Sequence, residues 1–191
     1  MNAGLTTVGS YSFQGCTALT TVVAPDTLTR INGFAFNGCP GLSSVSLNEG
    51  LTFVGEYAFQ NCSGLKIITI PSTVTSISSY TFSGCSGLTE VNLPETLTTI
   101  YAYAFQNCTS LVSIDIPDSV TTMAARAFYN CTKLSEVGYP AGWTKVLDYY
   151  NNESSYYGEG SKYIHSPFYG CSSLAKVEVP EGVTKIPNNA F

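Results

Sequence analysis

The sequence predicts a solenoid, a single domain of similar coils stacked along residues 1–191. Two observations predict it: phenylalanine recurs every 23 residues, and cysteine recurs at the same spacing, three residues after each phenylalanine. The phenylalanines at this repeat position are Phe13, Phe36, Phe59, Phe82, Phe105, Phe128, Phe168 and Phe191, and a cysteine follows the first seven. The step from Phe128 to Phe168 is 40 residues, so one coil carries an insertion of 40 − 23 = 17 residues. Such a period indicates coils that bury one another's apolar edges.

The first half of each repeat predicts a β-strand. Apolar residues alternate with polar ones in L-x-x-V-x-L spacing, as at Leu88, Val91 and Leu93, and a proline such as Pro94 usually follows. Alternation suits a strand with one buried face, and proline ends the hydrogen-bonding ladder. A period in the twenties with this spacing is a leucine-rich-repeat signature. We therefore predict a leucine-rich-repeat solenoid of about seven coils, right-handed as parallel crossovers are.

The second half of each repeat predicts a shorter extended segment and a turn. Val74–Ile77 shows the pattern V-T-x-I, which is too short for a stable helix. The A-F-x-x-C segment that follows predicts a tight turn. We expect mostly strand and turn, with short 3₁₀ segments. The chain starts and stops in the middle of a repeat, so we expect the natural protein to continue in both directions.

The cysteines predict a buried column. All seven occupy one repeat position: Cys16, Cys39, Cys62, Cys85, Cys108, Cys131 and Cys171. The number is odd, and a leucine follows each cysteine three residues later. Free cysteine is among the most buried residue types, so we expect free thiols inside the coils. Disulfides between adjacent coils are the alternative, because strand spacing would permit them.

Composition argues against several function classes. The net charge is -5, which disfavours nucleic acid and anionic membrane surfaces as partners. No apolar run is long enough for membrane insertion. His165 is the only histidine, and the cysteines have no second ligand type beside them. We therefore expect no enzyme activity, no catalytic residues, no cofactor and no metal site.

The insertion at 148–165 is the first candidate binding site. It contains five tyrosines among serine, asparagine and glycine residues: Tyr149, Tyr150, Tyr156, Tyr157 and Tyr163. This mixture is typical of antibody paratopes, and an insertion in one repeat forms a loop on one face. The alternatives are that the loop folds back over the neighbouring repeat or is disordered. Trp143, where other repeats have an aliphatic residue, lines a pocket in one interpretation and belongs to the core in the other.

The outward strand positions are the second candidate, predicted to form the concave face. Their acidic and polar members are Glu90, Asn92, Asp115, Glu136 and Glu178. Carboxylates on neighbouring coils suit a calcium ion or a basic partner. The alternative is a solvated surface without a ligand.

A second aromatic column precedes the phenylalanine column by two residues. It comprises Tyr11, Phe34, Tyr57, Tyr80 and Tyr103, and it ends at Arg126. The regular spacing favours a structural ladder. An exposed adhesive stripe is the alternative.

The repeat A-F-x-x-C-x-x-L-x-x-V-x-I-P-x-x-V-T-x-I, over residues 5–147 and 166–191, resembles the BspA-like leucine-rich repeat family. That resemblance implies a surface or secreted protein of a bacterium or protist, and it supplies no catalytic motif. Several members of the family are adhesins. We therefore expect a non-enzymatic recognition or adhesion module that binds a protein, from host matrix or a cell surface, or a glycan. The alternative is a structural spacer or a scaffold that self-associates end to end.

Overall fold

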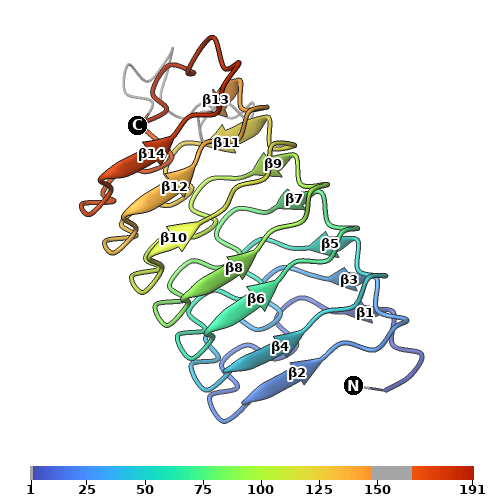
Figure 1. Cartoon of the computed structure of the whole chain (residues 1–191). Coiled ribbons are helices and arrows are strands. Elements are labelled where there is room, and N and C mark those ends of the chain that lie inside the picture. The colour runs from blue at the N-terminus through green and yellow to red at the C-terminus, as the bar shows by residue number, and fades with distance from the viewer. Residues whose placement is uncertain (1, 148–164) are drawn as a thin grey trace, which may run out of the picture.

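The computed structural model describes residues 2–147 and 165–191. Fourteen short strands lie within the described residues, and turns connect them (Figure 1). They are β1 (Thr7–Val8), β2 (Thr21–Val23), β3 (Arg30–Ile31), β4 (Ser44–Ser46), β5 (Phe53–Val54), β6 (Ile67–Thr69), β7 (Ser76–Ile77), β8 (Glu90–Asn92), β9 (Thr99–Ile100), β10 (Ser113–Ile114), β11 (Thr122–Ala124), β12 (Glu136–Gly138), β13 (Lys145–Leu147) and β14 (Lys176–Glu178).

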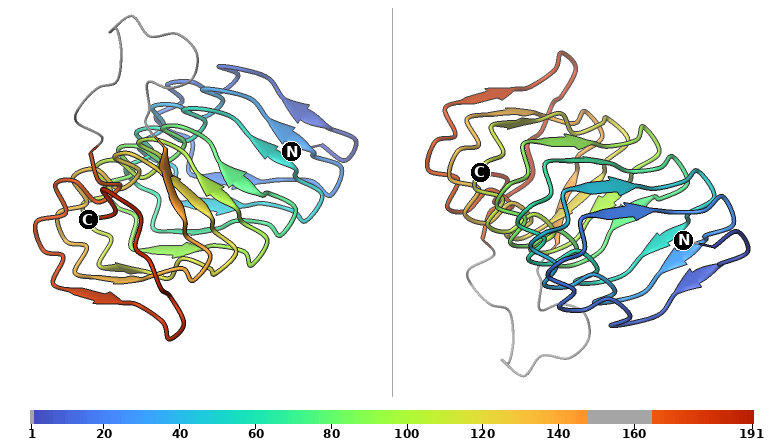
Figure 2. Two further views of the ribbon diagram at one scale, coloured as in Figure 1. Left: turned by 90° about the horizontal axis from the view of Figure 1, so that it is seen from above. Right: turned by 90° about the horizontal axis from the view of Figure 1, so that it is seen from below.

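The strands form two rows along the stack, and they alternate between the two rows along the chain as far as β14 (Figure 1). The even-numbered row comes from the L-x-x-V-x-L segments and the odd-numbered row from the V-T-x-I segments. Every pairing is parallel and joins equivalent residues, as in Thr7 with Arg30 and Ile67 with Glu90. Figure 2, seen along the stack, shows each coil lying over the next with a progressive twist. The predicted leucine-rich-repeat solenoid is confirmed.

The segments between the rows are turns. Cys85 N donates to Phe82 O, and Leu88 N donates to Cys85 O, so hydrogen bonds span three residues without building a helix. The expected short 3₁₀ segments do not appear in the part of the chain that the structure describes, which also contains no helix able to span a membrane. Each turn also donates to the next coil, which competes with helical pairing: Phe82 N bonds Ala104 O.

The insertion leaves the register of the stack intact. Strand β12 pairs with β10 on one side and with β14 on the other, although 40 residues separate Glu136 from its partner Lys176. The rings of Phe128 and Phe168 stack at 5.1 Å. The coil after the insertion therefore sits where the repeat places it.

The core consists of the columns that the period predicts. The phenylalanine rings stack face to face, at 5.5 Å between Phe82 and Phe105 with 13° between the ring planes. Cys39, Cys62, Cys85, Cys108 and Cys131 are buried. All seven cysteines are free, but the predicted buried column is confirmed only for these five, because Cys16 is exposed and Cys171 is partly exposed.

The second aromatic column has left-handed backbone conformation. Tyr57 and Tyr80 have φ of 60° and 58°, and their rings stack at 4.7 Å with 7° between the planes. The same conformation recurs just before each cysteine, at Gly84 (75°) and Asn107 (57°). Glycine and asparagine tolerate positive φ, whereas tyrosine adopts it only where its surroundings hold it. Ring stacking supplies that support, which agrees with the structural-ladder hypothesis.

Candidate functional site

The even-numbered strands present a face whose side chains do not pack in the core. The middle residue of each strand points inward, as Val22 and Val137 show, and its two neighbours point outward. We call this set the outward strand face. It comprises Thr21, Val23, Ser44, Ser46, Ile67, Thr69, Glu90, Asn92, Ser113, Asp115, Glu136, Gly138, Lys176 and Glu178.

The outward strand face changes character along the stack. Val23 and Ile67 are 56% and 49% exposed among small polar residues on β2, β4 and β6. From β8 onward the face carries four carboxylates and one lysine. Contacts between coils do not constrain these side chains, so they can differ from coil to coil. Such a surface is suited to binding a partner.

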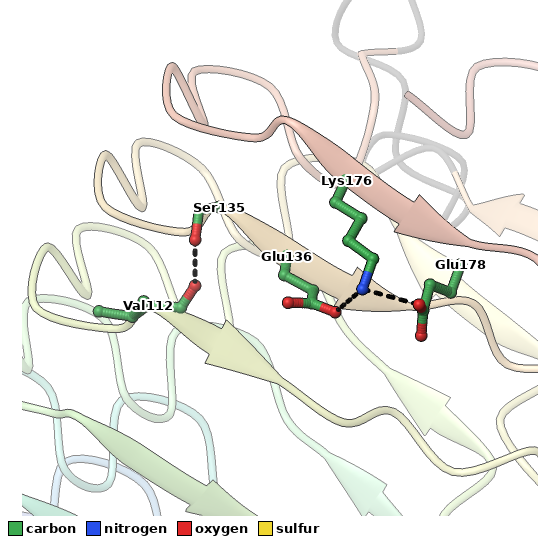
Figure 3. Close-up of polar contacts among 5 residues, drawn as sticks. All are labelled: Val112, Ser135, Glu136, Lys176 and Glu178. Atoms are coloured by element: carbon green, nitrogen blue, oxygen red, sulfur yellow. Dashed lines mark hydrogen bonds and ion pairs between the residues drawn. The ribbon is translucent and has the colours of Figure 1, made fainter.

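A three-residue ion cluster lies at the charged end. Lys176 Nζ is 2.7 Å from Oε1 of Glu136 and 2.7 Å from Oε1 of Glu178. The parallel register places Lys176 beside Glu136 on the adjacent strand, and Glu178 follows two residues later on the same strand face. Figure 3 shows the ammonium group between the two carboxylates. The hydrogen bonds to these carboxylates raise the pKa of Lys176 above its usual value, so it is a cation at physiological pH.

Hydrogen bonds just before the strands fix this face. Ser135 Oγ donates to Val112 O at 3.3 Å, as Figure 3 shows. Thr89 Oγ1 makes the equivalent bond to Lys66 O. These bonds add to the strand pairing, so the outward side chains project from a rigid support.

The candidates Glu90 and Asn92 contact each other. Asn92 Nδ2 donates to Glu90 Oε1 at 3.0 Å and to Thr69 Oγ1 at 3.2 Å. Both side chains are exposed. The amide bridges two coils and leaves a polar surface between the apolar and the acidic parts of the face.

A depression of about 280 Å³ opens at Gly138, where the outward column lacks a side chain. Oδ1 of Asp115 lies 3.1 Å from the position a Cβ atom would take on Gly138. The walls include Asp118, Glu178 and the apolar Val179. A second depression of about 140 Å³ lies on the other side of Asp115, toward β8. Asp115 is therefore the ridge between two hollows.

Trp143 belongs to the core, which corrects the interpretation that it lines a ligand pocket. Its side chain is 1% exposed, and its Nε1 donates to Lys145 O at 2.9 Å. Tyr139 packs against it and donates its hydroxyl hydrogen to Trp143 O at 3.1 Å. Rings of Phe168 and Phe191 meet it edge-on. The larger rings fill the coil next to the insertion.

The five tyrosines of the insertion lie outside the described residues. The structure therefore brings together only the strand candidates, with Asp115 directly after β10, Glu136 on β12 and Glu178 on β14. Sequence reasoning did not single out Gly138, Asp118 or Lys176 as site residues. Two signals were present: Gly138 is the one glycine in the outward columns, and Lys176 is their one lysine.

The acidic residues do not form a metal site in this part of the chain. Among residues 2–147 and 165–191, no three His, Cys, Asp or Glu side chains gather to hold a metal ion. The calcium alternative therefore has no ligand set there.

His165 stacks obliquely on Tyr169 with 4.6 Å between ring centroids.

The chain matches the family model described as the BspA type leucine rich repeat region, in six copies over residues 1–108, 52–158 and 159–191. None of the curated proteins compared with the chain matches it.

Several solved structures resemble the chain. A T. pallidum leucine-rich repeat protein is 26% identical with a TM-score of 0.75, over 97% of this chain and 80% of that one. A Bacteroides ovatus leucine-rich repeat protein is 28% identical with a TM-score of 0.63, over 76% of this chain and 44% of that one. A leucine rich cell surface protein of Faecalibacterium prausnitzii is 22% identical with a TM-score of 0.61, over 93% of this chain and 58% of that one.

Proposed function

Because the chain belongs to the BspA type leucine-rich repeat family, we propose that it is a non-enzymatic recognition module of the adhesion type, surface-bound or secreted, that binds a partner protein. The family points to protein interaction as the general role. The observation that carries the proposal is the outward strand face, a rigid surface whose side chains vary from coil to coil while the core columns stay constant.

The outward strand face is preorganised for binding. Strand pairing and the Ser135-type hydrogen bonds hold the face, so a partner that docks on it orders few protein groups. Exposed Val23 and Ile67 offer apolar contact at one end, and the carboxylates offer charge complementarity at the other. The tyrosine-rich insertion remains a second proposed contact region, for a protein or a glycan.

The test is binding of the purified chain to an array of host matrix and cell-surface proteins. We expect Ile67→Ser with Glu90→Ala to weaken binding if the partner covers the middle of the outward strand face. Tyr156→Ala with Tyr157→Ala tests the insertion in the same assay. Asp26→Ala with Glu56→Ala is the control, because both carboxylates are exposed and lie outside the face.

Two results would contradict this proposal. One is an array without any bound protein. The other is binding that survives both the face variant and the insertion variant unchanged. Circular dichroism and urea unfolding of each variant would establish that the solenoid is intact.

The alternative is a structural spacer or self-associating scaffold. Within the described residues, β1 and β2 each pair with a strand on one side only, and an edge of this kind can pair with another chain. Light scattering over a range of concentrations tests this. A mass that rises with concentration supports self-association, and a constant mass near 20.4 kDa contradicts it.

A further inference from the structure

We infer that the depression at Gly138 receives an arginine or lysine side chain from a basic segment of the partner protein. This inference rests on the proposed function, because it names the chemistry of the partner that the outward strand face binds. It places the contact at the acidic end of the face, between Asp115 and Glu178, and away from Val23 and Ile67.

The size of the depression suits one side chain. Its volume of about 280 Å³ falls just below the roughly 300–1,000 Å³ typical of sites for small-molecule ligands. Gly138 provides the floor, because a side chain there would fill the space beside Asp115 Oδ1. A folded domain cannot enter a hollow of this size, but one extended side chain can.

The lining matches a long cationic side chain in two respects. The exposed Val179 and Pro180 supply apolar wall, which suits the hydrocarbon stem of arginine or lysine. Asp115, Asp118 and Glu178 supply carboxylates for the charged head. Apolar wall and carboxylates together distinguish this hollow from a merely acidic surface.

The charge balance leaves the depression negative. Within the described residues, the ion pairs of this region are those of Lys176, which shares one positive charge between Glu136 and Glu178. Asp118 Oδ1 accepts a hydrogen bond from Ala141 N at 2.7 Å, so the turn that holds it is fixed. Asp115 lies between the two hollows and contributes to both. An incoming cation would therefore meet oriented and incompletely neutralised carboxylates.

Lys176 is an internal competitor for this position. Its ammonium group already contacts Glu178, which lines the depression, at 2.7 Å. Its side chain is 54% exposed, so an ammonium group can reach these carboxylates from the solvent side. A partner's cation would compete with Lys176 for Glu178. Removing Lys176 should therefore strengthen binding, whereas removing the carboxylates should weaken it.

The first experiment measures fluorescence anisotropy of a labelled hexa-arginine peptide with the whole chain at low ionic strength. Asp115→Asn with Glu178→Gln should weaken binding roughly three- to tenfold, as expected for losing two exposed ion pairs. Asp26→Asn with Glu56→Gln makes the same change in net charge outside the face and should leave affinity nearly unchanged. Equal weakening by both pairs would overturn the inference, because net charge alone would then explain binding.

The second experiment uses changes with opposite expected signs. Lys176→Gln should tighten hexa-arginine binding severalfold, and Lys145→Gln, an exposed lysine on the odd-numbered row, is the charge-matched control. When it is combined with Lys176→Gln, Gly138→Leu should abolish the gain in affinity, because the leucine side chain fills the hollow. Unfolding curves identify any variant with a damaged fold. Gly138→Ala then replaces Gly138→Leu and should reduce the gain in affinity, because its methyl group lies beside Asp115 Oδ1.

The outcomes separate the inference from the proposed function. Unchanged affinity in Lys176→Gln, or tight peptide binding by a stable Gly138→Leu chain, would overturn the depression as the site. The array result with Ile67→Ser and Glu90→Ala does not depend on these residues. An array partner captured by the chain but insensitive to Asp115→Asn with Glu178→Gln would leave the proposed function standing and overturn this inference.

Discussion

Cys85 donates its thiol hydrogen to the backbone carbonyl oxygen of Phe59, with 3.2 Å between Sγ and O. The contact joins one coil to the preceding one, and it repeats along the stack at Cys62 with Phe36 and at Cys131 with Phe105. Cysteine therefore serves here as a small buried donor, and its bond to Phe59 O adds to the one that Cys62 N already donates to that oxygen. A reactive thiol needs an electropositive and accessible position, which the buried cysteines of this column do not have.

The first prediction concerns stability at high pH. Burial raises the pKa of Cys62 from 9.0 to about 12. The folded state holds this proton more tightly than the unfolded state does. The contribution of the protonated thiol to the free energy of unfolding is therefore complete below pH 9 and is lost as pH rises toward about 12. We expect the free energy of unfolding to fall by about 1 kcal/mol for this thiol between pH 8 and pH 10.

Urea unfolding at the two pH values measures this effect, with Cys62→Ala as the comparison. The variant is expected to be less stable at neutral pH but to lose less stability on going to pH 10. A decline of the same size in the wild type and in Cys62→Ala would contradict the assignment to this thiol.

The second prediction concerns thiol modification in the native state. Cys16 is exposed, whereas Cys85 and Cys108 are buried. Burial also raises the pKa of Cys108, which keeps the thiol in its less reactive protonated form. Iodoacetamide followed by peptide mass spectrometry should label Cys16 first and Cys85 only after urea is added. Early labelling of Cys85 would show that the coils open locally.

The fold was predictable because stacking imposes the same choice on every coil. Phe82, Cys85 and Leu88 each contact their own equivalents in neighbouring coils. The same packing requirement therefore recurs in seven copies of the repeat. The positive φ of Tyr57 was not predictable from polarity or spacing. It depends on ring contacts with the coils on either side, which local sequence does not reveal.

The candidate site was predictable only in part. Glu136 and Lys176 follow from the register once the inserted residues are subtracted. The pairing of Lys176 with both Glu136 and Glu178 depends on side-chain geometry, and so does the hollow at Gly138. Trp143 gave a signal compatible with either pocket or core, and its contacts with Tyr139 and Phe191 place it in the core.

The third prediction concerns the backbone at Asn61, where φ is 60°. Equivalent positions hold Gly38 and Gly84, also with positive φ. Asn61→Gly should change the free energy of unfolding by no more than about 0.5 kcal/mol, because glycine adopts this conformation freely. Asn61→Ala should cost about 1–2 kcal/mol, since its Cβ disfavours the left-handed region. Urea unfolding of both variants tests the difference, and equal stabilities would contradict it.

The fourth prediction concerns Trp143, whose burial makes it both a packing residue and a reporter. Trp143→Ala should lower the free energy of unfolding by about 3–5 kcal/mol, because the cavity would lie among Tyr139, Phe168 and Phe191. Trp143→Phe should cost less: it keeps an aromatic ring but loses the hydrogen bond to Lys145 O, worth about 1 kcal/mol. Circular dichroism in urea measures both variants.

The single tryptophan also allows a direct optical check in the unmodified chain. A side chain that is 1% exposed should emit at short wavelength and resist quenching by acrylamide until the coil unfolds. Fluorescence and circular dichroism should then report the same urea midpoint, because Trp143 packs within the continuous core. A fluorescence transition well before the loss of circular dichroism would show instead that the coil around Trp143 opens separately from the stack.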